Sequence, residues 1–400
     1  MRTPWIVFLA SGVTLLGYNT PVHNPGVALI DKQEFVGLDG IAHLATGGEA
    51  PWLRSHDDAC RRFGRLKSAG MAGREEMFAV YRRAKARVAR LLGVESTAVA
   101  FLAHASEGLN QAVHAVDWRP GDNAVVADLE YPSLIYPVSA LRAHGVEVRV
   151  IETRDHYLSL DRLAAAVDRR TRLVLVSHVS YLTGQRVDLA RCAEIARAAG
   201  AWLAVDATHA LGVAPVPGEL CDFVVSSCYK WLLATHGVGI FAYDAARVGP
   251  LEPATLGWHS VDHRGGLAAP LDVPLRPDAA RLEAGNPSLL GLLVLDNALD
   301  VLDGLDPKAV LAHAHELGGE LIEGLRRLGL PVITPVAPDE RAGNICFLAA
   351  DGQGLAARLA ERGVLVWGGD GRIRISAHVH DGADDVRRCL DELASISPRL

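Results

Sequence analysis

The sequence predicts an α/β protein whose mainly parallel sheet is covered by helices on both faces. From residue 98 to about 246, short apolar runs alternate with helical patterns such as Leu189–Ala199. Strands that alternate with helices form βαβ units, and functional loops then lie at the carboxyl ends of the strands. The seven runs that fit buried strands are 98–101, 124–127, 146–151, 173–177, 202–205, 223–225 and 239–242.

The chain is long enough for a second, smaller core, because half of its 400 residues are apolar. We predict a large domain over 35–290 and a smaller C-terminal α+β domain over 291–400, with residues 35–60 free to pack on the smaller one. Residues 1–34 are predicted to be an N-terminal arm or apolar extension. Their apolar run from Pro4 to Gly17, behind Arg2, imitates a signal peptide, but we favour a docked arm or a start-site extension over export.

Composition argues against several classes of partner. The net charge of −7 is mild and no basic block is present, so neither nucleic acid nor a membrane is expected as a partner. The six cysteines are scattered without a CxxC pair. This usage indicates reduced thiols in a cytoplasmic protein, with no disulfide framework and no metal site.

A lysine and an aspartate follow two of the predicted strands. Lys230 stands between Tyr229 and Trp231 after the run 223–225, and Asp206 ends the run 202–205. Burial lowers the pKa of a lysine and makes its amine a nucleophile towards an aldehyde. A lysine that forms a Schiff base and a carboxylate that keeps a pyridine nitrogen protonated are the two groups that pyridoxal phosphate (PLP) requires. We therefore hypothesise a PLP site.

Two other strand ends carry residues that suit this cofactor. The segment His104–Gly108 opens a helical pattern, so its backbone N–H groups could hold a phosphate; a serine N-cap is the structural alternative. Tyr131 follows the run 124–127 and could stack on the pyridine ring, although a tyrosine next to a proline is more often a packing residue.

Three further positions remain open between a functional and a structural role. The segment Ser177–Gly184 could contact the cofactor or the substrate, or could form a plain turn. His209 could meet the phenolic oxygen of the ring, or could lie exposed on a helix capped by Asp206. Arg372 and Arg374 share a face of an alternating strand, and one of them could bind a substrate carboxylate or lie exposed on a sheet edge.

With these residues in view, the chain resembles the class V, or cysteine desulfurase-like, branch of the fold-type I PLP-dependent enzymes. The resemblance covers about 35–393, and the branch includes kynureninases and isopenicillin N epimerase-like proteins. Six motifs occur in order, namely Ala105-Ser106-Glu107-Gly108, Glu130-Tyr131-Pro132-Ser133, Ser177-His178-Val179-Ser180, Asp206-Ala207-Thr208-His209, Ser227-Cys228-Tyr229-Lys230 and Arg374-Ile375-Ser376-Ala377-His378.

The resemblance implies a role for each position in the motifs. Lys230 would be the catalytic Schiff-base lysine and Asp206 the partner of the pyridine nitrogen, while Arg374, with Tyr181 nearby, would face the substrate. It also implies a homodimer with shared active sites. The remaining cofactor positions that it implies are Ser106, Glu107, Ser227 and Tyr229 at the phosphate, Tyr131 on the ring, His209 at the phenolic oxygen, and Asn286 near the neighbouring subunit's phosphate.

The chain departs from the desulfurases in ways that bear on function. Those enzymes carry a mobile cysteine shortly before the carboxylate-binding arginine, and residues 364–371 contain none. Tyr181 stands where the desulfurases have asparagine. Tyr229 replaces the usual histidine, as in kynureninases, and Asn286 replaces the usual threonine. A persulfide-forming desulfurase is therefore disfavoured.

The most favoured function is a class V aminotransferase acting on an amino acid, because Lys230 is left as the only evident acid and base. A carbon–sulfur lyase, a desulfurase-like activity or an epimerase is the alternative. A non-catalytic binding protein with this fold is more distant. An NAD-dependent oxidoreductase is disfavoured, since no GxGxxG follows the first strand.

Overall fold

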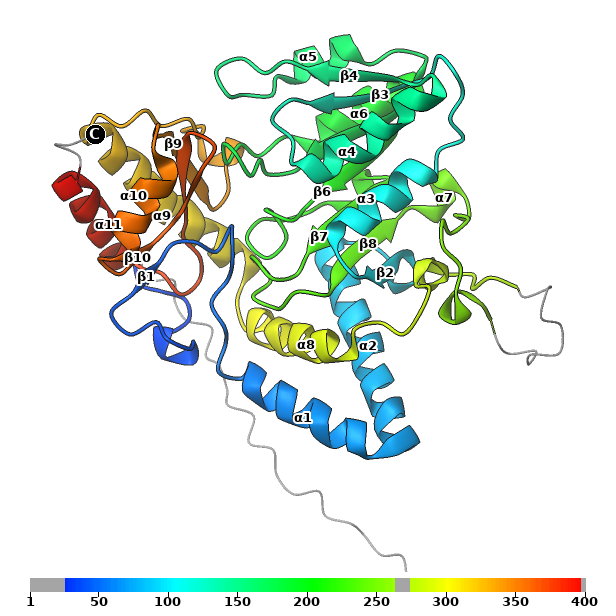
Figure 1. The fold of residues 1–400 in the computed structure, drawn as a ribbon, viewed down its shortest axis with the longest axis horizontal. Helices are drawn as coiled ribbons and strands as arrows, with labels where there is room; N and C mark the ends of the chain where they lie inside the picture. Colours follow the sequence, from blue (N-terminus) through cyan, green and yellow to red (C-terminus); the bar gives the residue numbers. More distant parts are fainter. Residues whose placement is uncertain (1–25, 263–273, 397–400) are drawn as a thin grey trace, which may run out of the picture.

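The computed structural model describes residues 26–262 and 274–396 (Figure 1). Residues 1–25 of the predicted arm, and the last residues of the predicted C-terminal domain, lie outside this range. Within the described residues, no helix combines the length and the apolar character that a membrane span requires. The boundaries at 34/35 and 290/291 stay predictions.

The centre of the larger part is a seven-stranded sheet in the order β2-β8-β7-β6-β5-β3-β4. The five strands from β7 to β4 are parallel, and β8 runs antiparallel to both of its neighbours. The predicted α/β fold with a mainly parallel seven-stranded sheet is therefore confirmed. The strands are β2 (Val99–Leu102), β3 (Asn123–Ala127), β4 (Glu147–Ile151), β5 (Thr171–Ser177), β6 (Trp202–Asp206), β7 (Phe223–Ser227) and β8 (Gly239–Tyr243).

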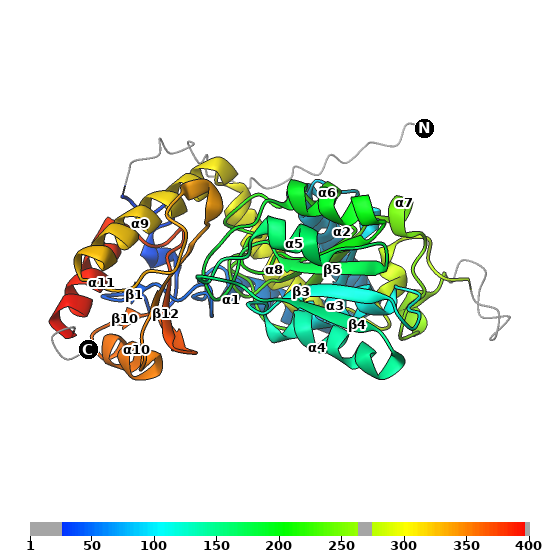
Figure 2. The same cartoon turned by 90° about the horizontal axis from the view of Figure 1, so that it is seen from above.

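Helices cover both faces of this sheet (Figure 2). Side chains alternate along each strand, so Val125 packs into one core and its neighbour Val126 into the core on the opposite face. Because both faces are covered, the inner strands are continuously apolar. One face carries α3 (Ala105–His114) and α4 (Pro132–Ala140); the other carries α2 (Gly70–Leu92), α5 (Leu160–Ala166) and α6 (Leu189–Ala199).

The smaller part is built on a three-stranded antiparallel sheet in the order β11-β12-β9. The entry segment joins it: β1 (Ala42–His43) pairs in parallel with β10 (Val364–Leu365), as Figure 1 shows. Ala42 and Leu44 lie in the same apolar core as the C-terminal strands. The remaining elements are β9 (Asn344–Leu348), β11 (Trp367–Gly369), β12 (Arg372–Ser376), α9 (Pro307–Arg327), α10 (Gly352–Ala360) and α11 (Ala383–Ile396).

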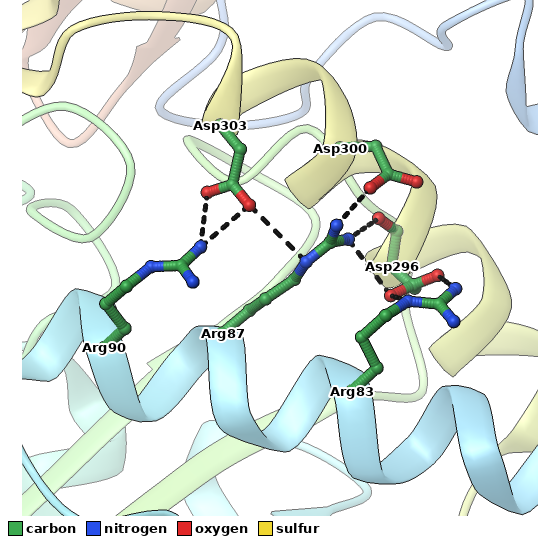
Figure 3. A network of polar contacts seen from close by, with 6 residues as sticks. All are labelled: Arg83, Arg87, Arg90, Asp296, Asp300 and Asp303. Atoms are coloured by element: carbon green, nitrogen blue, oxygen red, sulfur yellow. Dashed lines mark hydrogen bonds and ion pairs between the residues drawn. The ribbon is translucent and has the colours of Figure 1, made fainter. Parts of the chain in front are cut away.

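The helix that precedes the smaller part, α8 (Leu289–Asp303), packs against α1 (His56–Ser68) and α2. A ladder of ion pairs joins α8 to α2 (Figure 3). Arg87 Nη1 lies 3.1 Å from the buried Asp296, and Arg90 Nη2 lies 2.8 Å from Asp303. The spacing places the three arginines on one side of α2 and the three aspartates on the facing side of α8. The full set is Arg83, Arg87, Arg90, Asp296, Asp300 and Asp303.

Candidate active site

The loops that follow the strand ends meet around one cavity. Eight residues that the sequence analysis singled out line it: Ser106, Tyr131, Tyr181, Asp206, His209, Ser227, Tyr229 and Lys230. They come from the segments after β2, β3, β5, β6 and β7. These strands all end at the same edge of the sheet, which is why residues up to 124 positions apart share one cavity.

Lys230 is largely enclosed. Its Nζ lies 3.1 Å from His209 Nε2, 5.6 Å from the centre of the Tyr229 ring and 6.0 Å from that of Tyr131. Burial, with the charge of Arg374, lowers the pKa of Lys230 to about 8, although Asp206 and Glu49 oppose this shift. A larger fraction of the amine is therefore uncharged near neutral pH than in an exposed lysine.

The turn that carries Lys230 is held from several sides. The Trp231 side chain is fully buried, and its carbonyl oxygen is 2.9 Å from His378 Nε2. Gly212 has a φ of +105°, and a Cβ there would lie 2.3 Å from the same carbonyl oxygen. Only glycine therefore lets the loop after β6 approach this turn. Such packing fixes where the lysine amine enters the cavity.

Asp206 is a buried carboxylate that lacks an ion-pair partner among the described residues. Its Oδ1 accepts a 2.8 Å hydrogen bond from the backbone N–H of Thr208. Burial raises the pKa of Asp206, and the Thr208 hydrogen bonds and the charge of Lys230 oppose that effect. A buried carboxylate requires a cation or donors in its surroundings, and the side of Asp206 that faces the cavity is open to one.

His209 is buried, so the alternative of an exposed helical histidine is wrong. The chain after Asp206 forms consecutive turns instead of a helix. His209 Nε2 faces Lys230, and its Nδ1 is 3.0 Å from Asn344 Nδ2 on β9. Burial and the cationic Lys230 and Arg374 lower the pKa of His209 well below its usual value, so the ring is neutral.

The start of α3 lines the cavity. The Ser106 hydroxyl is 2.7 Å from that of Ser133, a residue whose role the sequence analysis did not consider. His104, not a serine, is the N-cap: its Nδ1 accepts from the Glu107 backbone N–H at 3.0 Å. The Glu107 carboxylate turns back to the N–H of Ala103. Glu107 therefore does not line the cavity, while Ser106 does.

Tyrosine rings form another wall of the cavity. Tyr131 and Tyr181 meet edge to face with centroids 5.0 Å apart. Tyr229 stacks on His236 at 4.1 Å, and His236 Nε2 lies 3.3 Å from a Glu49 carboxylate oxygen. No local sequence pattern predicts the Glu49–His236 pair, because its members lie 187 positions apart.

Arg374 lies beside the cavity as a buried cation without a carboxylate partner among the described residues. Its Nη1 donates to the Tyr181 carbonyl oxygen at 2.9 Å, and its guanidinium lies 4.8 Å from the Trp367 ring centre. Its Nε makes no hydrogen bond. Arg374 is close enough to lower the pKa values of Lys230 and His209. Arg372 instead donates to the Leu182 carbonyl oxygen.

Asn286 lies away from this cavity. Its Oδ1 accepts a 2.7 Å hydrogen bond from Arg74 Nη2. Arg74, together with Trp258, lines a larger cavity of about 540 Å³ elsewhere on the subunit. Within one subunit, Asn286 is thus not brought together with the other predicted cofactor residues, and its role at a neighbouring phosphate stays a prediction.

Glu130 is a buried carboxylate behind the cavity. It accepts a 2.9 Å hydrogen bond from the Ser177 backbone N–H and a short one from the Ser177 hydroxyl. Burial nevertheless raises its pKa to about 7, and the nearby Asp206 adds to the increase. The motif around Tyr131 contains Glu130, but only the fold shows that it is enclosed.

The raised pKa of Glu130 predicts a pH-dependent stability. Between the model-compound value of 4.5 and about 7, the folded chain retains a proton that the unfolded chain has released. The resulting stabilisation is present in full at acid pH and is lost as the pH rises through 7. Glu130→Gln should therefore make the free energy of unfolding less dependent on pH. Compared with its value at acid pH, the difference between the variant and the wild type should shift in favour of the variant by up to about 3 kcal/mol at pH 8. Urea unfolding of the cofactor-free protein at pH 4.5, 6, 7 and 8 measures the free energy of unfolding of both proteins.

The exposed Glu361→Gln is the matched control and should leave the profile unchanged. Parallel curves for the wild type and Glu130→Gln across this pH range would contradict the raised pKa.

A comparison with known protein families identifies the family of this chain. The profile of the family "Aminotransferase class-V" matches residues 62–388, most of the chain. The chain belongs to the class-V aminotransferase family. This membership confirms the resemblance drawn from the sequence and makes the chain a PLP-dependent enzyme.

The relatives that this class-V protein matches carry the names of different activities. Isopenicillin N epimerase of Streptomyces clavuligerus is 27% identical over 89% of the chain and 95% of its own length. A probable cysteine desulfurase of Pseudomonas aeruginosa is 27% identical over 95% and 93%. An uncharacterized aminotransferase of Schizosaccharomyces pombe is 28% identical over 76% and 79%.

Solved structures show the same fold. The apo cysteine desulfurase of Thermococcus onnurineus has a TM-score of 0.84 at 20% identity, covering 92% of this chain and 98% of that one. A mutant of the cystine C–S lyase C-DES, with glycine covalently linked to its PLP cofactor, also has a TM-score of 0.84 at 20% identity, covering 91% and 99%. The predicted fold-type I architecture, with a smaller α+β part, is thereby confirmed.

The residues of the cavity fit PLP. A lysine of lowered pKa and a buried carboxylate that has no ion-pair partner within the described residues line the same cavity. Hydroxyl groups and the start of α3 also line it, and anions are favoured at a helix N-terminus. Lys230 would bind the aldehyde, Asp206 would hold a proton on the ring nitrogen, and Ser106 and Ser227 would contact the phosphate.

Proposed function

We propose that this class-V enzyme is an aminotransferase that acts on an α-amino acid. The observation that carries the proposal is Arg374, a buried guanidinium that has no carboxylate partner in the described part of the chain and lies beside the cavity of Lys230. A buried cation without a counter-ion is costly, and an α-carboxylate would supply the missing charge in bidentate form.

The division of roles follows from the positions of the side chains. PLP, when bound, supplies an electron sink for charge that develops at the substrate Cα. Lys230 Nζ is the amine in the cavity that can remove and return the Cα proton. Arg374 binds the carboxylate and thereby orients the substrate, and the tyrosine wall limits access of water to the reacting atoms.

The cysteines give less support to a desulfurase. Cys346 pairs in register with Arg374 across β9 and β12 and is fully buried. Burial raises the pKa of the Cys346 thiol to about 11, so it is not a reactive thiolate. Trp367 lies over Arg374 in the segment where a mobile cysteine would be expected.

An epimerase is the second candidate. Inversion at Cα needs an acid or base on each side of the substrate, and the Glu49–His236 pair beside Tyr229 is a second ionisable pair near Lys230. The 27% identity with isopenicillin N epimerase over most of both chains supports the same candidate.

A panel of L- and D-amino acids, each with and without a 2-oxo acid acceptor, tests these functions. A transaminase converts the amino acid to its 2-oxo acid only when an acceptor is present. Loss of optical activity without an acceptor would replace this proposal with the epimerase, and sulfide or ammonia release would replace it with a lyase.

We also propose a cytoplasmic homodimer. Asn286 and its partner Arg74 lie outside the Lys230 cavity, so they are available to a neighbouring subunit's site. The six cysteines are unpaired and five are buried, as in proteins of a reducing compartment. Sedimentation equilibrium of the purified chain measures its assembly state.

A further inference from the structure

A chain of polar side chains runs from Lys230 into the smaller part of the molecule. Lys230 Nζ is 3.1 Å from His209 Nε2, and His209 Nδ1 is 3.0 Å from Asn344 Nδ2. Asn344 Oδ1 in turn accepts a 2.8 Å hydrogen bond from the Ser376 hydroxyl. All of these contacts are enclosed: Asn344 and Ser376 are fully buried, and His209 is 6% exposed.

The orientation of the Asn344 amide sets the direction of the next hydrogen bond. Its Oδ1 is directed at the Ser376 hydroxyl and its N–H₂ group at His209. An amide N–H₂ can only donate. His209 Nδ1 must therefore be the unprotonated nitrogen of the neutral ring, and the proton is on Nε2. That Nε2–H points at Lys230 Nζ, which can accept it once the amine is uncharged, at a pH above its pKa of about 8.

We propose that Asn344, oriented by Ser376, is a positioning residue that keeps the proton of His209 on Nε2. This inference rests on the proposed PLP function, because its consequence is a fixed hydrogen-bond donor directed at the site of the cofactor. Asn344 and Ser376 touch neither Lys230 nor the cavity, so their effect passes through His209.

The other groups around His209 do not impose this tautomer. Burial, Arg374 and the protonated form of Lys230 lower its pKa and keep the ring neutral, but a neutral ring can carry its proton on either nitrogen. The other ionisable groups that line the cavity with His209 and Lys230 are Asp206, His104, Tyr131, Tyr181 and Tyr229. None of them forms a hydrogen bond with His209 among the described residues.

The chain also joins the smaller sheet to the reacting amine. Ser376 lies two residues after Arg374 on β12. A Cβ at Gly47 would come within 2.6 Å of both Asn344 Oδ1 and the Ser376 hydroxyl, so glycine is required for the entry loop to pack there. The strand that offers Arg374 to the substrate thereby also orients the histidine that faces Lys230.

Nitrogen NMR of the ¹⁵N-histidine-labelled full chain without cofactor tests the tautomer directly. The His209 signals are identified by their loss in His209→Gln. At a pH above the Lys230 pKa of about 8, we expect a protonated Nε2 and an unprotonated Nδ1 in the wild type, and a mixture of the two tautomers in Asn344→Leu. The inference would be overturned if the wild-type His209 ring carried its proton on Nδ1, or if Asn344→Leu had the same His209 tautomer as the wild type.

Two further variants guard against a general loss of structure. Ser376→Ala keeps Asn344 but frees its amide to rotate, so an intermediate tautomer mixture is expected. Asn297→Leu is the matched control, because Asn297 Nδ2 makes an equivalent 2.9 Å contact with His56 Nδ1 away from the cavity. It should leave the His209 signals unchanged.

The PLP-loaded protein gives an independent measurement. A donor next to the cofactor's phenolic oxygen favours its anionic form, so weakening the donor should raise the midpoint of the visible-absorbance pH titration. For Asn344→Leu we expect a rise of about half to one pH unit. An unmoved midpoint would count against the inference. Failure to bind PLP at all would count against the proposed function alone, since the tautomer is measured without it.

Discussion

Lys230→Ala is expected to abolish the visible absorbance of the PLP-loaded protein and to lower turnover of any amino-acid substrate by at least about 10⁴-fold. In the proposed function the Lys230 amine is both the nucleophile that binds the cofactor and the acid and base, so the substitution removes two functions at once. Its lowered pKa of about 8 depends on burial and on Arg374. Absorbance spectra after dialysis show whether PLP stays bound, and mass spectrometry of the borohydride-reduced wild type shows whether it is attached to Lys230.

Lys85 provides the matched control. It is also a buried lysine whose pKa is lowered by burial, but it lines the larger cavity next to Tyr81. Lys85→Met should keep the visible band, and borohydride should label Lys230 but not Lys85. A Lys230→Ala protein that stays yellow after dialysis would show that the cofactor is attached elsewhere.

Much of the fold was predictable because the strands of a covered parallel sheet are continuous apolar runs. All seven predicted runs overlap the observed strands, and α6 has the predicted bounds Leu189–Ala199. That helix carries its own signals, with Asp188 as N-cap and Gly200 in the left-handed conformation after it. By contrast, α2 begins at Gly70 without a side-chain cap, and its first turn packs on α1, where a Cβ at Gly73 would meet the Leu66 carbonyl oxygen.

The site was predictable where one strand end supplies the residue, and unpredictable where distant segments meet. Lys230, Asp206 and Tyr131 each follow a run that the sequence reveals. Glu107 did not join them, because its N–H is used by the ring of His104 and its carboxylate by Ala103. Residue type alone does not show whether such a group makes a local hydrogen bond or binds a phosphate.

The contacts made by the smaller part were beyond sequence reasoning. Asn344 meets His209 from 135 residues away, and Glu49 meets His236 from 187 residues away. Neither pair has a periodic pattern or a motif. Each exists because β9 and the entry loop pack against the loops of the larger sheet, and only the folded chain defines that packing.

Arg374→Leu is expected to lower kcat/KM for α-amino acids by about 10²- to 10³-fold. Removing one member of a buried charge pair costs about 2–5 kcal/mol, and each 1.4 kcal/mol is tenfold. Initial rates with the best substrate of the panel measure the loss. Arg372→Leu is the matched control on the same strand; because Arg372 contacts the Leu182 carbonyl oxygen, we expect less than a few-fold change.

A second comparison tests whether Arg374 acts by binding the α-carboxylate of the substrate. The amine that corresponds to the best substrate, without its α-carboxylate, should react equally slowly with wild type and Arg374→Leu. If the variant loses as much activity towards this amine as towards the amino acid, Arg374 does not act by binding the carboxylate.

The same substitution should not reduce the stability of the substrate-free protein. The guanidinium is buried, its Nε lacks a hydrogen bond, and no carboxylate of the described residues pairs with it. Replacing such a charge with an apolar side chain removes its desolvation penalty, so the free energy of unfolding should stay equal or rise by about 1 kcal/mol. A loss of activity without a loss of stability would separate a ligand-binding role from a structural one. A fall of more than about 2 kcal/mol would instead make Arg374 a structural residue held by Tyr181 and Trp367.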